Sequence, residues 1–180
     1  MPIADQLTLA RIASAPLVVI LFTVSFPRHD YWGTAVFCVA MSTDWFDGRI
    51  ARRTGRTTSF GSLLDPVADK VLVLATLVVL LDRDVFPAWM VAAIVARELL
   101  ISGLRLAALE RGVVIAARDL GKLKTWTQAL AAAAGGLAAA GAWSTSVSWW
   151  LLLLAVTMTW VSGLDYARSA PAVLRGRPAT

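Results

Sequence analysis

Four carboxylates lie inside or beside apolar stretches of the sequence: Asp44, Asp47, Asp65 and Asp69. Charged side chains in such surroundings are costly and mark functional sites. The members of each pair are three or four residues apart, so on helices each pair projects from one face. The two pairs are nearly symmetric about Arg56, and an antiparallel helical hairpin that turns there would bring all four carboxylates to the same depth. Clustered anionic oxygens suit hard divalent ions such as Mg²⁺ or Mn²⁺.

The helices that carry these carboxylates belong to a strongly apolar chain. Of its 180 residues, 58% are hydrophobic and 16% are charged, and the mean hydropathy is +0.68. This composition predicts an all-α integral membrane protein with one domain, residues 1–170. We expect a short N-terminal interfacial segment over residues 1–8 and a disordered cytoplasmic tail over 171–180. Windows of about 20 apolar residues predict six transmembrane helices, at 9–26, 33–50, 62–81, 87–108, 122–142 and 147–167.

The basic residues are distributed asymmetrically along this chain. Of 17 Lys and Arg residues, only Arg28 and Arg83 fall in the loops expected after the first and third spans, and none falls in the loop after the fifth. The positive-inside rule therefore predicts that both termini and the carboxylate hairpin face the cytoplasm. Because the basic residues border membrane helices, anionic lipid headgroups or phosphorylated substrates are favoured as partners over nucleic acid. Cys38 is the single cysteine, which excludes a disulfide framework.

Between residues 44 and 69 the chain reads Asp-x2-Asp-Gly-x2-Ala-Arg-x8-Gly-x3-Asp-x3-Asp. This segment resembles the signature of the CDP-alcohol phosphatidyltransferase family at all eight fixed positions. The resemblance implies that Asp44, Asp47 and Asp65 are the principal ligands of two divalent metal ions. It also implies that Asp69 is the catalytic base and a further metal ligand. For CDP-diacylglycerol binding it implies Asp44, Gly48, Ala51, Arg52 and Gly61.

The chemistry of these residues agrees with that resemblance. Transfer of a phosphoryl-type group requires the developing negative charge to be neutralised, which two metal ions about 3.5–4 Å apart achieve. Gly48, Ala51 and Gly61 lack bulk, so a nucleotide and its diphosphate can approach the backbone closely. Arg52 can pair with a phosphate. With no histidine nearby, a carboxylate must be the general base, but the residues alone leave the division of roles among the four Asp open.

A second set of charged residues occupies the expected fourth span and the start of the fifth. Glu98 and Arg105 are seven residues apart and so lie on roughly one helix face, with Arg97 beside them. Lys122 and Lys124 follow at the cytoplasmic end of the next span. We expect the four cations to bind the phosphate of the acceptor alcohol. The alternative is a structural pair of Arg97 with Glu98, together with lysines that extend to the membrane interface.

Four further segments carry a narrower pattern: Leu7-Thr8-x2-Arg11, Arg97-Glu98-x3-Ser102-Gly103-Leu104-Arg105, Gly121-Lys122-x-Lys124-Thr125-x2-Gln128 and Ser162-Gly163-Leu164-Asp165-Tyr166. They resemble the phosphatidylglycerophosphate synthase branch of the family, and the likeness covers almost the entire chain. The resemblance implies a homodimeric bacterial enzyme of the cytoplasmic membrane. Such an enzyme joins CDP-diacylglycerol to sn-glycerol 3-phosphate and releases CMP.

Two other interpretations remain open at this point. A sister enzyme of the same family would use phosphatidylglycerol, giving cardiolipin, or inositol phosphate as the acceptor. A protein of a different class, a divalent-cation transporter, would use the acidic cluster as its pathway. Transport explains carboxylates within membrane helices but not the Gly, Ala and Arg spacing. It also predicts acidic residues that continue to the outer face, and the spans 33–50 and 62–81 have none there.

Overall fold

The computed structural model describes residues 3–54, 59–110 and 119–174, and the described residues form helices and turns without a strand. This confirms the all-α prediction. The number of expected helices also agrees, and each observed helix overlaps its expected range. The helices are α1 (Ile3–Thr23), α2 (His29–Thr54), α3 (Ser59–Asp82), α4 (Ala88–Glu110), α5 (Asp119–Ala139) and α6 (Thr145–Leu174).

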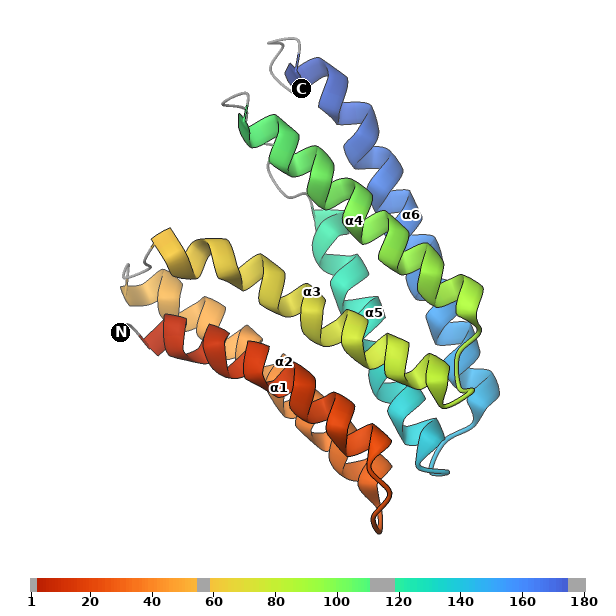
Figure 1. The fold of residues 1–180 in the computed structure, drawn as a ribbon. Coiled ribbons are helices and arrows are strands. Elements are labelled where there is room, and N and C mark those ends of the chain that lie inside the picture. Colours follow the sequence, from red (N-terminus) through yellow and green to blue (C-terminus); the bar gives the residue numbers. More distant parts are fainter. Residues whose placement is uncertain (1–2, 55–58, 111–118, 175–180) are drawn as a thin grey trace.

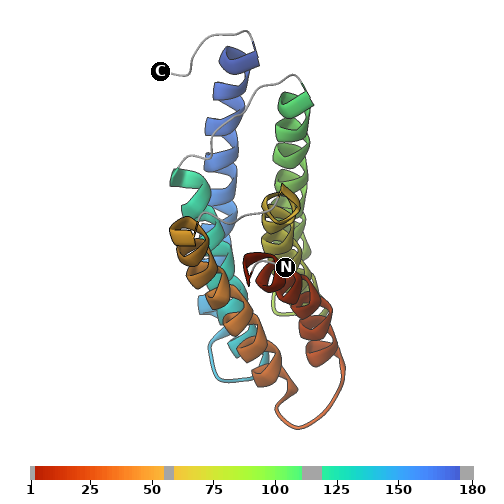
Figure 2. The same ribbon diagram turned by 90° about the vertical axis from the view of Figure 1, so that its left-hand side faces the viewer.

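The helices pack as two groups that meet along α3 and α5 (Figure 1). In one group α1 packs against α2 and α3, and in the other α5 packs extensively against α6, which also contacts α4. Helices α2 and α3 contact α5 across the boundary. The turns after α1, α3 and α5 gather at one end of the molecule, and at the other end α4 and α6 diverge from α2 and α3, as Figure 2 also shows.

Close backbone approach around α5 joins the two groups. Ala131 and Ala132 of this small-residue helix are buried in the core. A Cβ added at Gly135 would collide with the ring of Phe86, and one added at Gly136 would collide with the Thr34 side chain of α2. The run of small residues therefore serves packing within the chain, since only glycine leaves room for these side chains.

An ion pair ties two of the gathered turns together. Arg83, just after α3, donates two hydrogen bonds to the Asp30 carboxylate of α2, at 3.2 and 3.0 Å. His29 Nδ1 lies 3.3 Å from the same carboxylate. Because both carboxylate oxygens of the buried Asp30 accept from one guanidinium, this end of the bundle holds a matched pair of charges.

Three features differ from the sequence-based expectation or leave it coarser. Helix α1 runs without interruption from Ile3, so residues 3–8 of the expected interfacial segment belong to the first helix. Helix α6 continues to Leu174, so residues 171–174 of the expected tail are helical, and the remainder of the tail lies outside the described residues. Within the described part, one stretch is both long and apolar enough to cross a membrane, Thr145–Arg168, with a mean hydropathy of 1.6. The six-span topology and the location of the termini therefore remain predictions.

Candidate functional site

The predicted carboxylate hairpin corresponds to α2 and α3. Asp44 and Asp47 lie in α2, Asp65 and Asp69 lie in α3, and the two helices are in contact. At about 1.5 Å per residue, Asp44 lies about 15 Å before the last residue of α2, and Asp69 lies about 15 Å after the first residue of α3. Asp44 and Asp69 are thus equidistant from the ends of α2 and α3 that the hairpin joins, and the approach of the four carboxylates to one another stays a prediction.

The side chains of the four carboxylate residues lie outside the described part of the chain. Helix α2 also carries three of the expected CDP-diacylglycerol residues, Gly48, Ala51 and Arg52, and Gly61 lies in the first turn of α3. These positions are helical and their side-chain contacts are not described. The ligand and base roles therefore remain predictions, supported by the donor set: four carboxylates on two contacting helices provide the hard oxygen ligands that Mg²⁺ and Mn²⁺ prefer.

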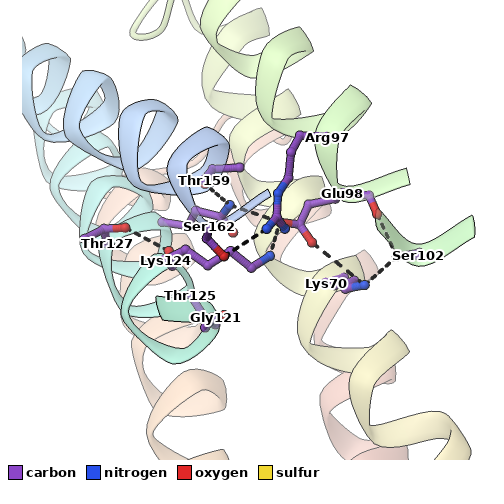
Figure 3. A network of polar contacts seen from close by, with 11 residues as sticks. Lys70, Arg97, Glu98, Ser102, Gly121, Lys124, Thr125, Thr127, Thr159 and Ser162 are labelled. Carbon is purple, nitrogen blue, oxygen red and sulfur yellow. Dashed lines mark hydrogen bonds and ion pairs between the residues drawn. The ribbon is translucent and has the colours of Figure 1, made fainter. Parts of the chain in front are cut away.

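A second polar cluster, centred on Glu98, is formed by described residues of α3, α4, α5 and α6 (Figure 3). Arg97 and Glu98 are both buried, at 4% and 2% exposure. Arg97 Nη1 donates to Glu98 Oε1 at 3.0 Å, and Arg97 Nη2 donates to Ser162 Oγ of α6 at 3.0 Å. The pair of Arg97 with Glu98, which the sequence left open, is therefore present.

Helix α5 contributes two further donors to the same carboxylate oxygen. Lys124 Nζ donates to Glu98 Oε1, and Gln128 Nε2 lies 3.4 Å from that atom. Gln128 also donates to Thr159 Oγ1 of α6 at 2.7 Å. Lys124 and Gln128 are four residues apart, so they project from one face of α5. Lys124 is buried in this contact, unlike a lysine that extends to an interface.

Lys70 of α3 is a member of the cluster that the sequence analysis missed. Its Nζ donates to Ser102 Oγ of α4 at 2.5 Å and lies 3.8 Å from Glu98 Oε2. Ser102 in turn donates to the backbone carbonyl of Glu98 at 2.6 Å. Lys70 lies inside an apolar span and directly follows Asp69. An isolated cation inside such a span is itself a signal of function, and it could have identified this residue.

Among the described residues, the Glu98 cluster holds more cations than carboxylates. Three cations, Lys70, Arg97 and Lys124, lie within 4 Å of one carboxylate. Buried charges are stable when they are paired and hydrogen-bonded, so a surplus of positive charge favours an additional anion. Arg97 Nε is buried and has no hydrogen-bond partner in the described part of the chain. It packs against Gly163, where a Cβ would lie 2.9 Å from that nitrogen.

Of the other two expected acceptor residues, Arg105 has no described contact with Glu98, and the side chain of Lys122 is not described. Arg105 lies two turns further along α4, and its guanidinium carbon is 5.7 Å from the centre of the Tyr166 ring. Arg105 Nε and the Tyr166 hydroxyl are buried and form no hydrogen bond with any described residue. Lys122 lies in the first turn of α5, and its side chain is outside the described part. The structure therefore brings Arg97 and Lys124 together, with Arg105 as a separate cation on α4.

Comparison with known proteins identifies the family. The model of the CDP-alcohol phosphatidyltransferase family matches residues 1–161. A protein of Bacillus subtilis (strain 168) is 42% identical over 142 residues, which are 72% of this chain and 74% of the relative. Proteins of Shigella flexneri serotype 5b and Escherichia coli (strain K12) are 38% and 37% identical over 178 residues, 96% of each chain. All three relatives are named CDP-diacylglycerol–glycerol-3-phosphate 3-phosphatidyltransferase. The chain therefore belongs to the CDP-alcohol phosphatidyltransferase family.

Proposed function

We propose that the chain transfers the phosphatidyl group of CDP-diacylglycerol to sn-glycerol 3-phosphate and releases CMP. One observation carries this proposal: three cations lie around the buried Glu98, and one of them, Lys70, directly follows the last carboxylate of the α2–α3 hairpin. Anionic groups that bind metal and cationic groups that bind phosphate are thus neighbours along α3. The similarity to relatives named for this reaction over 96% of the chain supports the same substrates.

Asp44, Asp47, Asp65 and Asp69 would hold two divalent ions, Mg²⁺ or Mn²⁺. When bound, such ions neutralise the charge that develops on the transferred phosphate. The donor chemistry fits, because all four residues offer hard carboxylate oxygens from two contacting helices. The family is the second support, since its signature contains these four residues.

The chain's own residues then divide the remaining tasks. Gly48, Ala51 and Gly61 let the cytidine diphosphate approach the backbone, and Arg52 pairs with its phosphates. Asp69 accepts the proton of the acceptor hydroxyl as that oxygen attacks the phosphorus that bears diacylglycerol. A new P–O bond forms, the bond from this phosphorus to CMP breaks, and CMP leaves with the bonding electrons. Every atom of the acceptor except that proton remains in the lipid product.

The acceptor phosphate would bind to cations of α4 and α5, namely Arg97, Arg105, Lys122 and Lys124. The positive surplus among the described residues around Glu98 supports a dianionic phosphomonoester acceptor over phosphatidylglycerol, whose phosphodiester carries a single negative charge. Within this set, Glu98 holds Arg97 and Lys124 in place by direct contacts. Arg105 retains a buried Nε that no described residue uses, so it has a donor to offer to the phosphate.

The proposed setting is the cytoplasmic membrane of a bacterium, with six spans, both termini and the active site on the cytoplasmic side, and a homodimeric assembly. Large apolar side chains on several helices are exposed, which suits contact with lipid tails. Examples are Val39, Leu99, Leu100, Trp126 and Trp150. A membrane location would keep the acyl chains of CDP-diacylglycerol in the bilayer while its headgroup enters the site.

The direct test is CMP release by the purified protein in detergent with CDP-diacylglycerol and Mg²⁺ or Mn²⁺. Three acceptors are compared: sn-glycerol 3-phosphate, inositol phosphate and phosphatidylglycerol. We expect release that depends on glycerol 3-phosphate. Release with another acceptor alone would keep the phosphatidyl transfer and overturn the choice of acceptor. Absence of release with all three would refute phosphatidyl transfer and return attention to cation transport.

A further inference from the structure

We propose that Lys70 is a specificity-determining residue that binds the phosphate of the acceptor, an inference that rests on the proposed function. Neither the family signature nor the cations of α4 and α5 include this residue. Lys70 is the contribution of α3 to the Glu98 cluster, through Ser102 Oγ at 2.5 Å and Glu98 Oε2 at 3.8 Å. The proposal follows from its unused hydrogen-bonding capacity, its exposure and its position on the helix.

The hydrogen bonds within the cluster leave Lys70 with donors to spare. An ammonium has three N–H donors, and among the described residues Lys70 uses one, on the neutral hydroxyl of Ser102. Glu98 Oε1 accepts from Arg97, Lys124 and Gln128, whereas Lys70 lies beyond hydrogen-bond distance of Oε2. Glu98 Oε1 thus accepts from α4 and α5, while the buried Oε2 has no hydrogen-bond partner among the described residues. Lys70, 3.8 Å from Oε2, therefore makes no hydrogen bond to an anionic oxygen in the described contacts.

The exposure of the cluster members points the same way. The side chains of Arg97 and Lys124 are 5% and 11% exposed, whereas that of Lys70 is 33% exposed. A soluble phosphate that approaches this cluster meets Lys70 before it meets the buried pair. The ammonium can keep its hydrogen bond to Ser102, which positions it, and donate to such a ligand with its remaining N–H groups.

The position of Lys70 on α3 matches the geometry that an acceptor needs. Asp69 and Lys70 are consecutive, so their Cα atoms differ by about 1.5 Å in depth and by about 100° around the helix. The acceptor must present its hydroxyl to the carboxylates of α2 and α3 and its phosphate to the cations of α4. Lys70 can serve both groups, because it lies on the helix that carries the proposed base and contacts Ser102 of α4.

The experiment measures KM for sn-glycerol 3-phosphate and, separately, KM for CDP-diacylglycerol in Lys70→Gln. We expect KM for glycerol 3-phosphate to rise about tenfold, the effect of losing one charge-assisted hydrogen bond, with less than a threefold change in KM for CDP-diacylglycerol. Lys70→Arg should restore KM to within about threefold of the original value, since the charge returns. Arg83→Gln is the matched control, because it also removes a cation from a carboxylate but at the opposite end of the bundle.

The possible results distinguish failure of the Lys70 proposal from failure of the proposed function. If the unaltered protein does not release CMP with glycerol 3-phosphate, the proposed function fails. If it does and Lys70→Gln leaves that KM unchanged, or raises KM for CDP-diacylglycerol instead, the role of Lys70 is refuted and the transferase stands. Equal loss for both substrates with a lower melting temperature would mean a structural role and would also refute it. Should Lys70→Gln not fold, Ser102→Ala keeps the charge but removes its anchor: a rise of about threefold in KM for glycerol 3-phosphate supports the role, and no change contradicts it.

Discussion

Two ionic clusters in the same bundle differ in their ratio of cations to carboxylates. At the end where the turns gather, Asp30 receives two hydrogen bonds from one guanidinium, that of Arg83, and the formal charges cancel. Around Glu98, three cations from three helices share one carboxylate. The Asp30–Arg83 pair has one anion for one cation, whereas the described residues of the Glu98 cluster carry a surplus of positive charge. Charge balance, more than burial alone, thus distinguishes a pair with a structural role from a cluster that we propose as a phosphate site.

Removal of the carboxylate of Glu98 should have the largest effect on stability and activity. In Glu98→Gln, Arg97 and Lys124 would be left buried without their anion, and breaking a buried pair in this way costs about 3–5 kcal/mol. We expect a strong fall in the melting temperature in detergent and loss of CMP release. Because the remaining charge is all positive, added glycerol 3-phosphate should recover part of the lost stability. An unchanged melting temperature would show that Glu98 does not organise the cluster.

The next effect concerns Arg105, the cation on α4 that does not contact Glu98 in the described contacts. Arg105→Gln should raise KM for glycerol 3-phosphate about tenfold, since a charge-assisted hydrogen bond to the phosphate is lost. KM for CDP-diacylglycerol should change little. The measurement is initial-rate kinetics with each substrate varied in turn. A rise in both constants, or in neither, would remove Arg105 from the acceptor site.

The smallest effect should come from the Asp30–Arg83 pair. Arg83→Gln removes both hydrogen bonds to Asp30, and because Arg83 is partly exposed and His29 stays 3.3 Å from Asp30, we expect a smaller loss of stability than in Glu98→Gln. Both KM values should stay as they are, because this pair joins the start of α2 to the end of α3, whereas the carboxylate hairpin lies toward the other ends of these helices. Thermal unfolding and substrate kinetics of the same preparation test both parts. A tenfold change in either KM would show that the Asp30–Arg83 pair also affects substrate binding and would contradict its purely structural role.

The sequence predicts the helices better than their ends. Apolar windows locate the six helices because burial or lipid contact requires long apolar runs, but a helix does not stop where its apolarity stops. Helix α2 therefore continues through the basic stretch to Thr54, and α6 continues to Leu174. Hydropathy averaged over a window reports whether side chains prefer water or an apolar environment. Helix ends depend instead on backbone hydrogen bonds and capping residues.

The candidate site is predictable to the extent that it is local in sequence. Spacing within one helix places Asp65 with Asp69 on a shared face, and adjacency allows a pair of Arg97 with Glu98. The contact of Lys70 with Ser102 joins residues 32 positions apart on different helices, and no periodicity encodes it. Such contacts depend on how α3 and α4 pack, which is decided by tertiary structure.

In the proposed mechanism, the carboxylate hairpin and the cationic cluster act on one acceptor, which enters the lipid with its phosphate. The most direct measurement follows ¹⁴C-labelled sn-glycerol 3-phosphate into the organic phase while CMP is quantified, with CDP-diacylglycerol and Mn²⁺ present. We predict one label in lipid for each CMP released, and at least about a hundredfold loss of both in Asp69→Asn. CMP release without label in lipid would mean that water, not glycerol 3-phosphate, is the acceptor, and would contradict the account.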